Sequence, residues 1–321
     1  MKRLFVTVFL LLLWSIPIIY AEDLYDHIFI KERFIVSNYP ESISEPGLIF
    51  NEQVKNEAFR VMYYHKCVSK FPIEMNLLVT NKGKSPTPIL VYQGIAGPHI
   101  DGFWAGDKST EKFYRSLLTK QKPIIIQPGH TESLLVHPLT FNKISTGIVR
   151  IQPTIKSSLL GIQLKVIDPR YPGIGNIDSH YTYASFNQGF ITLKSTIDLK
   201  NIQYEIPIGH PDQHLKDQNN IELQGNYGLL YDIQLNITNS NSWYQPVDLL
   251  VSPLGGGLRT TVMVNQSIAQ TRFLSHHTNL NPEQIKNFLF NPLETKTLRI
   301  VMMPEAGSFY PVNLVVQRRK L

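Results

Sequence analysis

The loop at residues 97–109, GPHIDGFWAGDKS, contains side chains that could bind a ligand or do chemistry. His99, Asp101, Trp104 and Asp107 stand there among three glycines, just ahead of a predicted helix. Loops carried by a rigid β framework are where binding residues collect. We therefore interpret these four residues as a candidate ligand-binding site. The alternative is a turn and helix cap in which Trp104 covers the core.

Catalysis would need more than this loop supplies. Asp101 and Asp107 could form the carboxylate pair of a glycoside hydrolase, but no serine of the loop lies in a GxSxG elbow. The glycine-rich GGGLRT at residues 255–260 lacks the GK[ST] ending of a phosphate loop. We assign no catalytic residue and expect a protein that is not an enzyme. The alternative is a hydrolase or metal-dependent enzyme that uses the 97–109 loop or the GHPDQH segment.

The GHPDQH segment carries three potential metal ligands at alternate positions, His210, Asp212 and His214. In an extended chain this spacing would place all three side chains on one face. Pro211 and the polar loop around it argue against the rigid geometry that a metal site requires. We therefore predict no metal and no cofactor, and keep these three residues as the alternative metal site.

The first 21 residues have the order of a secretory signal. Lys2 and Arg3 precede an apolar run, and the small residue Ala21 stands just before Glu22 and Asp23. We expect cleavage after Ala21 and a secreted or periplasmic protein. The alternative is an uncleaved signal anchor, which would be the chain's only attachment to a membrane.

The charge distribution bears on which partners the protein can bind, and the cysteine content bears on how its core is held together. The net charge is +6, and it falls to +4 when Lys2 and Arg3 leave with the signal. The basic residues are scattered among acids, without the basic and aromatic patch of a nucleic-acid groove, so we expect no nucleic-acid partner. Cys67 is the single cysteine and cannot form a disulfide within the chain. Its place after the strand-like FRVMYYHK predicts a packed core residue.

Two distant segments read alike and indicate the architecture. MNLLVTNKGKSPTPILVYQGIAG, from Met75, and IQLNITNSNSWYQPVDLLVSPLGG, from Ile233, each give an alternating strand that ends in Thr-Asn, a polar turn, a second strand and glycine. Such strands and turns predict an all-β protein of two tandem immunoglobulin-like β-sandwich domains. One short helix is expected in each domain: STEKFYRSLLTKQK, capped by Ser109, and NPEQIKNFLF, capped by Asn281.

The predicted organisation has five parts. A signal peptide at 1–21 is followed by an N-terminal arm or edge strand at 22–56 and a first β-sandwich at 57–168. An irregular connector with a possible hairpin spans 169–220, and a second β-sandwich spans 221–321. Turn residues between alternating segments place these boundaries.

A GNYG motif opens the second sandwich. Gly225 and Gly228 allow positive φ, Asn226 tolerates the left-handed region, and Tyr227 or Tyr231 could bury its ring while its hydroxyl holds a neighbouring turn. We interpret the motif as structural. The alternative is a pair of aromatic rings that faces a ligand such as a sugar.

With this motif and its following strand, LQGNYGLLYDIQLNITNSN, the chain resembles an uncharacterised family of secreted proteins best known from cyanobacteria. The resemblance implies export and a tandem β fold, and no activity. LLVTNKGKSPTPILVY and IIIQPGHTESLLV also resemble the immunoglobulin-like domains of periplasmic pilus chaperones. We expect binding or envelope assembly through the sandwich surfaces, with an envelope protein or a glycan as partner. The alternative is a chaperone-like binder that accepts a partner strand.

Overall fold

The structure is a computed structural model that describes residues 25–39, 41–171, 181–217, 220–276 and 282–319. The predicted signal peptide and its cleavage point lie outside these residues. The chain divides into a short first unit that ends at Lys31 and a second compact unit, Glu32–Leu321, which holds every strand that the structure describes. Among the described residues, none of the helices has the length and apolar character needed to cross a bilayer.

The first sandwich consists of two sheets that enclose one apolar core, to which Val61, Leu77 and Leu164 contribute fully buried side chains. One sheet has the strand order β11 (Thr182–Phe186), β1 (Glu32–Tyr39), β4 (Ala58–Cys67), β9 (Ile144–Pro153), β6 (Thr87–His99) and β7 (Ile124–Ile126), with β2 (Ser42–Ile43) beside β4. The other has the order β3 (Gly47–Lys55), β10 (Leu159–Ile167), β5 (Ile73–Asn81) and β8 (Thr131–Leu139).

The second sandwich repeats this arrangement around a core that includes Ile233, Val251 and Leu314. One sheet has the order β12 (Phe190–Asp198), β14 (Leu230–Thr238), β21 (Thr295–Met302), β17 (Thr261–Val264) and β18 (Ser267–Gln270). The other has the order β13 (Gln203–Ile208), β22 (Val312–Arg318), β15 (Gln245–Pro253) and β20 (Glu283–Phe290). A small separate sheet pairs β16 (Gly257–Leu258) with β19 (Leu274–Ser275). The predicted all-β, sandwich-like fold is confirmed.

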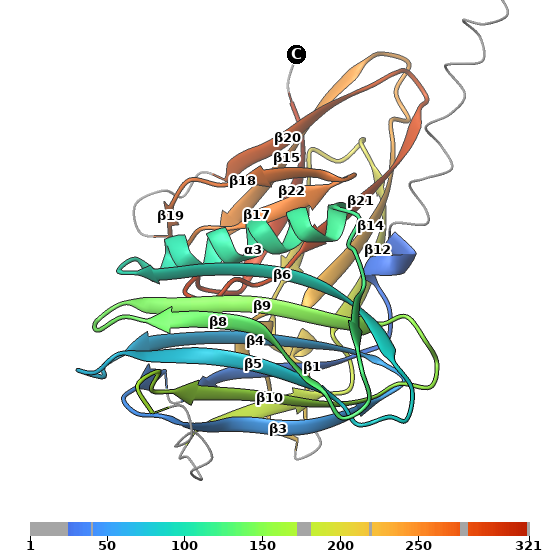
Figure 1. The fold of residues 1–321 in the computed structure, drawn as a ribbon. Helices are drawn as coiled ribbons and strands as arrows, with labels where there is room; N and C mark the ends of the chain where they lie inside the picture. The colour runs from blue at the N-terminus through green and yellow to red at the C-terminus, as the bar shows by residue number, and fades with distance from the viewer. Residues whose placement is uncertain (1–24, 40, 172–180, 218–219, 277–281, 320–321) are drawn as a thin grey trace, which may run out of the picture. The chain divides into compact units, whose positions relative to one another are not determined.

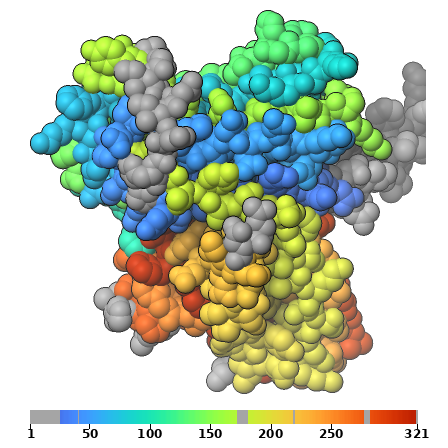
Figure 2. Space-filling view, turned by 90° about the horizontal axis from the view of Figure 1, so that it is seen from below, coloured from blue at the N-terminus to red at the C-terminus, as the bar shows by residue number. Residues whose placement is uncertain are grey.

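The two sandwiches have one topology. The series β1, β4, β9, β6, β7 corresponds in chain order and position to β12, β14, β21, β17, β18. Likewise β3, β10, β5, β8 corresponds to β13, β22, β15, β20. Both sandwiches begin with a parallel pair, β1 with β4 and β12 with β14, and continue with antiparallel pairs. Figure 2 shows the two halves as separate masses, blue to green and yellow to red.

The matching sequence segments are not topologically equivalent strands. They are β5–β6 and β14–β15, whereas β5 corresponds to β15. What repeats is a strand-ending corner: the side chains of Asn81 and Asn239 each donate to the carbonyl oxygen of a distant segment, at Ile126 and Asn291, with both distances 2.8 Å. Each asparagine is fully buried, and its Oδ1 accepts the N–H two residues on. The same corner therefore occurs at the ends of two strands, β5 and β14, that are not equivalent in the fold.

Several predicted boundaries need correction. The segment predicted as an N-terminal arm or edge strand contributes two strands to the first sandwich: β1, which lies between β11 and β4, and β3, which is the edge strand of its sheet. The predicted connector supplies β11 to the first sandwich and β12 and β13 to the second. The predicted hairpin in it is wrong, since β12 pairs with β14 and β13 pairs with β22. Alternation within a short segment reveals a strand but not its distant partner.

One of the two predicted helices exists. Helix α3 (Gly102–Leu118) is capped by Asp101 and not by Ser109, which lies buried within it and donates to the carbonyl oxygen of Gly94 at 2.8 Å. The second predicted helix is wrong, because residues 283–290 form the edge strand β20 along β15. Sheet pairing overrides the local capping signals there. Figure 1 shows α3 lying along β6, with β17 and β18 on its other side.

Candidate binding site between the two sandwiches

A buried ion cluster in the first sandwich binds the backbone of the second. Arg60 lies beside Glu32, with 2.9 Å from its Nε to Glu32 Oε1, and Nε of Arg150 is 2.8 Å from Glu32 Oε2. The side chains of all three residues are at most 1% exposed. The remaining nitrogens of Arg60 donate to the carbonyl oxygens of Gly189 and Gly228. Because these carbonyls belong to the second sandwich, Arg60 fixes one sandwich against the other.

The GNYG motif forms the turn that receives Arg60. Gly225, Asn226 and Gly228 adopt φ values of 69°, 52° and 80°. The fully buried Asn226 accepts the N–H of Leu215 at 3.0 Å and donates to Tyr231 Oη at 2.7 Å. These contacts leave Asn226 and Tyr231 no free face for a ligand, so both act in the framework.

Gly228 lets the two sandwiches approach closely. A Cβ atom at this position would lie 2.4 Å from Met62 Sδ and 2.8 Å from Phe34 Cζ, both in the first sandwich. Such distances leave no room for a side chain at Gly228 unless Met62 and Phe34 shift or the sandwiches separate. The motif is therefore a docking turn, in which Tyr227 is the one aromatic residue left beside open space.

Asp107 also belongs to the contact between the sandwiches. Its side chain is 1% exposed and accepts from Thr261 Oγ1 at 2.7 Å and from Gln270 Nε2 at 3.0 Å, while Arg259 Nε is 3.4 Å away. Burial raises the pKa of Asp107, and these partners lower it in part. The hydrogen bonds use both carboxylate oxygens, so Asp107 joins α3 to β17 and β18.

Glu305 stands close by in the second sandwich. Its carboxyl group receives the Oγ1 hydroxyl of Thr260 at 2.8 Å, the N–H of Thr261 at 2.6 Å and the hydroxyl of Tyr310 at 2.5 Å. Burial raises the pKa of Glu305 to about 8, against the opposing effect of its three donors and with a contribution from Asp107. Glu305 is thus a titratable group inside the contact region.

The other three residues of the predicted loop site lie together. The rings of His99 and Trp104 are 4.3 Å apart between centroids, and the N–H of Asp101 donates to His99 Nδ1 at 3.0 Å. Asp101 in turn accepts the N–H of Trp104 at 3.2 Å as the N-cap of α3. The structure therefore groups His99, Asp101 and Trp104 at the start of α3 and places Asp107 in the buried contact.

The GHPDQH segment does not form a shared face. Residues Pro211–Gln213 make a 3-10 turn, which sends the flanking histidines apart. His210 Nδ1 lies 2.7 Å from Asp212 Oδ1 at the surface, whereas His214 Nε2 accepts the N–H of Gly225 at 3.0 Å. The alternative site of three ligands on one extended strand is therefore wrong. Across the ranges that the structure describes, no group of three or more His, Cys, Asp or Glu residues is placed to hold a metal.

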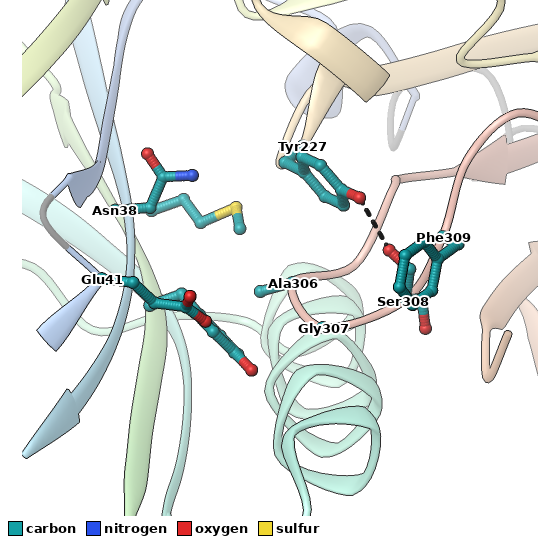
Figure 3. A pocket seen from close by; sticks show the side chains of 9 residues that line it. Asn38, Glu41, Tyr227, Ala306, Gly307, Ser308 and Phe309 are labelled. Atoms are coloured by element: carbon teal, nitrogen blue, oxygen red, sulfur yellow. Dashed lines mark hydrogen bonds between the residues drawn. The ribbon is translucent and has the colours of Figure 1, made fainter. Parts of the chain in front are cut away.

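A pocket of about 290 Å³ opens where the two sandwiches meet (Figure 3). Its first wall comes from the end of β1 and from β4, and its second from the GNYG turn and the turn between β21 and β22. Tyr227 Oη donates to the carbonyl oxygen of Ser308 at 2.8 Å, which ties the two parts of the second wall together. The lining residues are Asn38, Glu41, Met62, Tyr64, Tyr227, Ala306, Gly307, Ser308 and Phe309.

The predicted loop borders this pocket. A Cβ at Gly102 would lie 2.3 Å from Tyr64 Oη, and one at Gly307 would lie 2.7 Å from the carbonyl oxygen of Gly102. Burial, with the negative charges of Glu41 and Asp101, raises the pKa of Tyr64 to about 12. The start of α3 therefore contributes charge to the pocket from its edge.

Aromatic residues continue outward from the pocket. The ring centroid of Phe309 lies 6.3 Å from that of Phe103 in α3, and the ring centroid of Phe103 lies 4.9 Å from that of Phe273. The side chains of Phe309 and Phe273 are 54% and 49% exposed. Sequence reasoning missed Tyr64, Glu41 and Phe309 as site residues. The tyrosine pair of FRVMYYHK and the PEAGSFYP turn are the signals that could have identified two of them, but nothing local shows that they meet.

Comparisons with known proteins leave the family open. No protein-family model matches the chain, and no curated protein does. Dimeric latent PorU from Porphyromonas gingivalis is similar at 7% identity and a TM-score of 0.18, over 90% of this chain and 20% of that chain. The CBM22-1–CBM22-2 tandem domain of Paenibacillus barcinonensis Xyn10C is similar at 8% identity and a TM-score of 0.14, over 81% of this chain and 75% of that chain. The multicopper oxidase Fet3p is similar at 8% identity and a TM-score of 0.15, over 91% of this chain and 61% of that chain. Likenesses this low carry no argument.

Proposed function

We propose that this chain is an exported binding protein, without enzymatic activity, that holds its ligand in the pocket between the two sandwiches. The observation that carries the proposal is the origin of the pocket walls: Tyr64 and Glu41 come from one sandwich, and Tyr227 and Phe309 come from the other. Ligand sites occur preferentially at interfaces between domains, where concave surfaces with a few polar groups form.

Hydrogen bonds outside the pocket fix the turns that form its second wall, which favours binding. Arg60 anchors the GNYG turn that carries Tyr227. Ser308 donates from Oγ to the carbonyl oxygen of Arg259 at 2.8 Å and accepts the N–H of Arg259 at 3.1 Å, which fixes the turn that carries Phe309. A site that is already ordered loses less entropy when a ligand binds.

Four buried or partly buried titratable residues have structural partners, which supports a role without catalysis. Asp107 and Glu305 hold β17, and His214 accepts the N–H of Gly225. Nδ1 of His137 lies 2.6 Å from Tyr63 Oη, and burial lowers the pKa of His137. A general acid or base needs access to its substrate. These groups instead bond to the framework. Export to the periplasm or outside the cell, with an envelope protein or a glycan as partner, remains part of the proposal.

Strand addition at a sheet edge is the second candidate. Strand β20 pairs on one side with β15 and ends its sheet, and its Leu289 side chain is 56% exposed. An open edge with an exposed apolar side chain is a surface to which an extended segment can add.

Site-specific photocrosslinking in the exporting host tests both candidates. A benzoylphenylalanine replaces Phe309 at the pocket, Leu289 on the β20 edge, or Leu293 as a control that is 73% exposed in a turn. We expect a discrete adduct at position 309 and none at 293. An adduct at 289 alone would favour strand addition. Equal yields at 309 and 293, or no adduct at 309, would contradict pocket binding.

A further inference from the structure

We infer that the pocket between the sandwiches selects a positively charged group, an ammonium or a guanidinium. The inference rests on the proposed function, since it names the ligand class of the same pocket. It goes further by stating which chemical group enters and which side chains select it.

The lining combines aromatic rings with one acid. Tyr64, Tyr227 and Phe309 supply three rings, Glu41 supplies a carboxylate, and the lining contains no lysine, arginine or histidine. Cations are attracted to the faces of aromatic rings, by about 0.5–1 kcal/mol at exposed sites and more when water is excluded. The composition therefore matches a cation and opposes an anion.

Glu41 is available to a ligand. Its main-chain carbonyl accepts the N–H of Lys66, but no described residue forms a hydrogen bond or ion pair with its carboxylate. Figure 3 shows this side chain on the first wall, across from Tyr227. A guanidinium or ammonium that enters between them would form a charge-assisted hydrogen bond to Glu41, which is roughly twice as strong as a neutral one.

The start of α3 does not reverse this selectivity. A helix N-terminus carries a partial positive charge that would favour an anion. Here the Asp101 carboxylate accepts the N–H of Trp104 as the cap. Its negative charge acts on Tyr64 in the same direction as that of Glu41. Two acidic groups thus act on Tyr64, and one of them caps the end of the helix.

The depth of the pocket suits a single cationic head on a short chain. Met62, Tyr64 and Ala306 are at most 9% exposed and form its inner part, whereas Glu41 and Phe309 are exposed. The same head could belong to a free amine or to a lysine or arginine side chain of a partner protein. Both sources share one chemistry, and the experiment separates them.

Titration of the purified full chain with matched probes tests the inference. The cationic probes are methylguanidine and the capped peptide acetyl-Gly-Arg-Gly-amide; acetyl-Gly-citrulline-Gly-amide is the neutral isostere, and glucose is a neutral sugar. We expect the arginine peptide to bind at least tenfold more tightly than the citrulline peptide. Methylguanidine as tight as the peptide would identify a free cation as the ligand, and a tighter peptide would identify a protein side chain.

The Glu41→Gln variant shows whether the selectivity comes from the pocket. We expect at least a tenfold loss of arginine-peptide binding, with unchanged melting temperature, because the carboxylate has no hydrogen-bond or ion-pair partner among the described residues. Glu132→Gln, an exposed acid on β8, changes the net charge equally and serves as the matched control. Equal binding of the arginine and citrulline peptides, no binding of any cation, or equal loss in both variants would overturn the inference. Glucose binding alone would overturn it and keep the proposed function, whereas failure of the crosslink at position 309 would remove both.

Discussion

Arg60 of the first sandwich donates a hydrogen bond to the carbonyl oxygen of Gly228 in the second. The same guanidinium is paired with Glu32, which also pairs with Arg150, and all three side chains are buried. The ion cluster of the first sandwich therefore binds the second, although each sandwich has its own apolar core. Loss of the arginine affects both halves, since it leaves a buried acid with one partner fewer and removes a donor from the carbonyl oxygens of Gly189 and Gly228.

We expect Arg60→Met to lower the free energy of unfolding by about 3–5 kcal/mol, the usual cost of breaking a buried ion pair from one side. Urea denaturation of the mature chain measures the change. The matched control is Arg115→Met, whose side chain is 65% exposed in a helix pair, for which a loss of under about 1 kcal/mol is expected. A loss at position 60 no larger than at 115 would show that the buried cluster does not couple the sandwiches.

Gly228→Ala should be strongly destabilising because it combines two penalties. The backbone has φ +80°, and the new Cβ would lie 2.4 Å from Met62 Sδ. Positive φ in a residue with a side chain costs about 1–3 kcal/mol by itself. The control is Gly255→Ala, where nothing lies within 4 Å of the new atom. Thermal melting compares the two variants, and similar melting temperatures for both would contradict the close approach of the sandwiches at the GNYG turn.

Glu305 predicts how stability depends on pH. Its pKa is raised from 4.5 to about 8 in the folded protein. Between these values the folded state keeps a proton that the unfolded state has released, so the free energy of unfolding falls as pH rises through this window. Glu305→Gln does not titrate. We therefore expect the melting temperature of the wild type to fall more than that of this variant between pH 5 and pH 8.

Neighbouring groups define the control for that measurement. Asp107 raises the pKa of Glu305, and Glu305 itself raises the pKa values of Tyr114 and Tyr310, which titrate far above the window. Burial also raises the pKa of Asp107 itself, so the double variant with Asp107→Asn should show a still flatter profile. If wild type and Glu305→Gln give parallel profiles from pH 5 to pH 8, the carboxyl group is ionised throughout, and its three donors outweigh its burial.

Cys67 should resist alkylation in the native protein. The side chain is fully buried, Sγ is 3.9 Å from the carbonyl oxygen of Ser69, and burial raises the pKa of the thiol. Only the thiolate reacts at a useful rate. We expect no modification by iodoacetamide at pH 8 without denaturant and complete modification in urea, measured by mass spectrometry. Rapid labelling of the folded chain would show that β4 opens.

The sequence predicts the strands better than their partners. Alternation and turn residues reveal most of the long strands, and the Asn81 and Asn239 corners are visible as Thr-Asn turns. The exceptions are β1 and β3, in a segment predicted as an arm or edge strand, and β20, predicted as a helix. The pairing of β12 with β14 and of β13 with β22 is set by contacts between distant segments. The sequence predicts a helix that starts at Ser109, whereas α3 starts at Gly102 and includes two glycines, Gly102 and Gly106, which are poor helix formers. Gly106 is required there, since a Cβ would lie 1.9 Å from the carbonyl oxygen of Ala306.

The pocket could not be predicted from local patterns for the same reason. Tyr64 is one of two adjacent tyrosines on a strand that is buried on both faces, so alternation gives no sign of which ring meets open space. Glu41 and Phe309 are separated by most of the chain and meet only when Arg60 and Gly228 bring the sandwiches together. The His99, Asp101 and Trp104 group was found because its members are close in sequence.

A pocket with one wall from each sandwich makes ligand occupancy and the association of the sandwiches thermodynamically reciprocal. A molecule that contacts both Tyr64 and Tyr227 is bound only while the two halves are docked, so its binding free energy adds to the work needed to pull them apart. By the same linkage, any force or partner that separates the halves must release the ligand. With a ligand bound there, the pair of sandwiches would have a mechanical response that a single sandwich of this topology lacks.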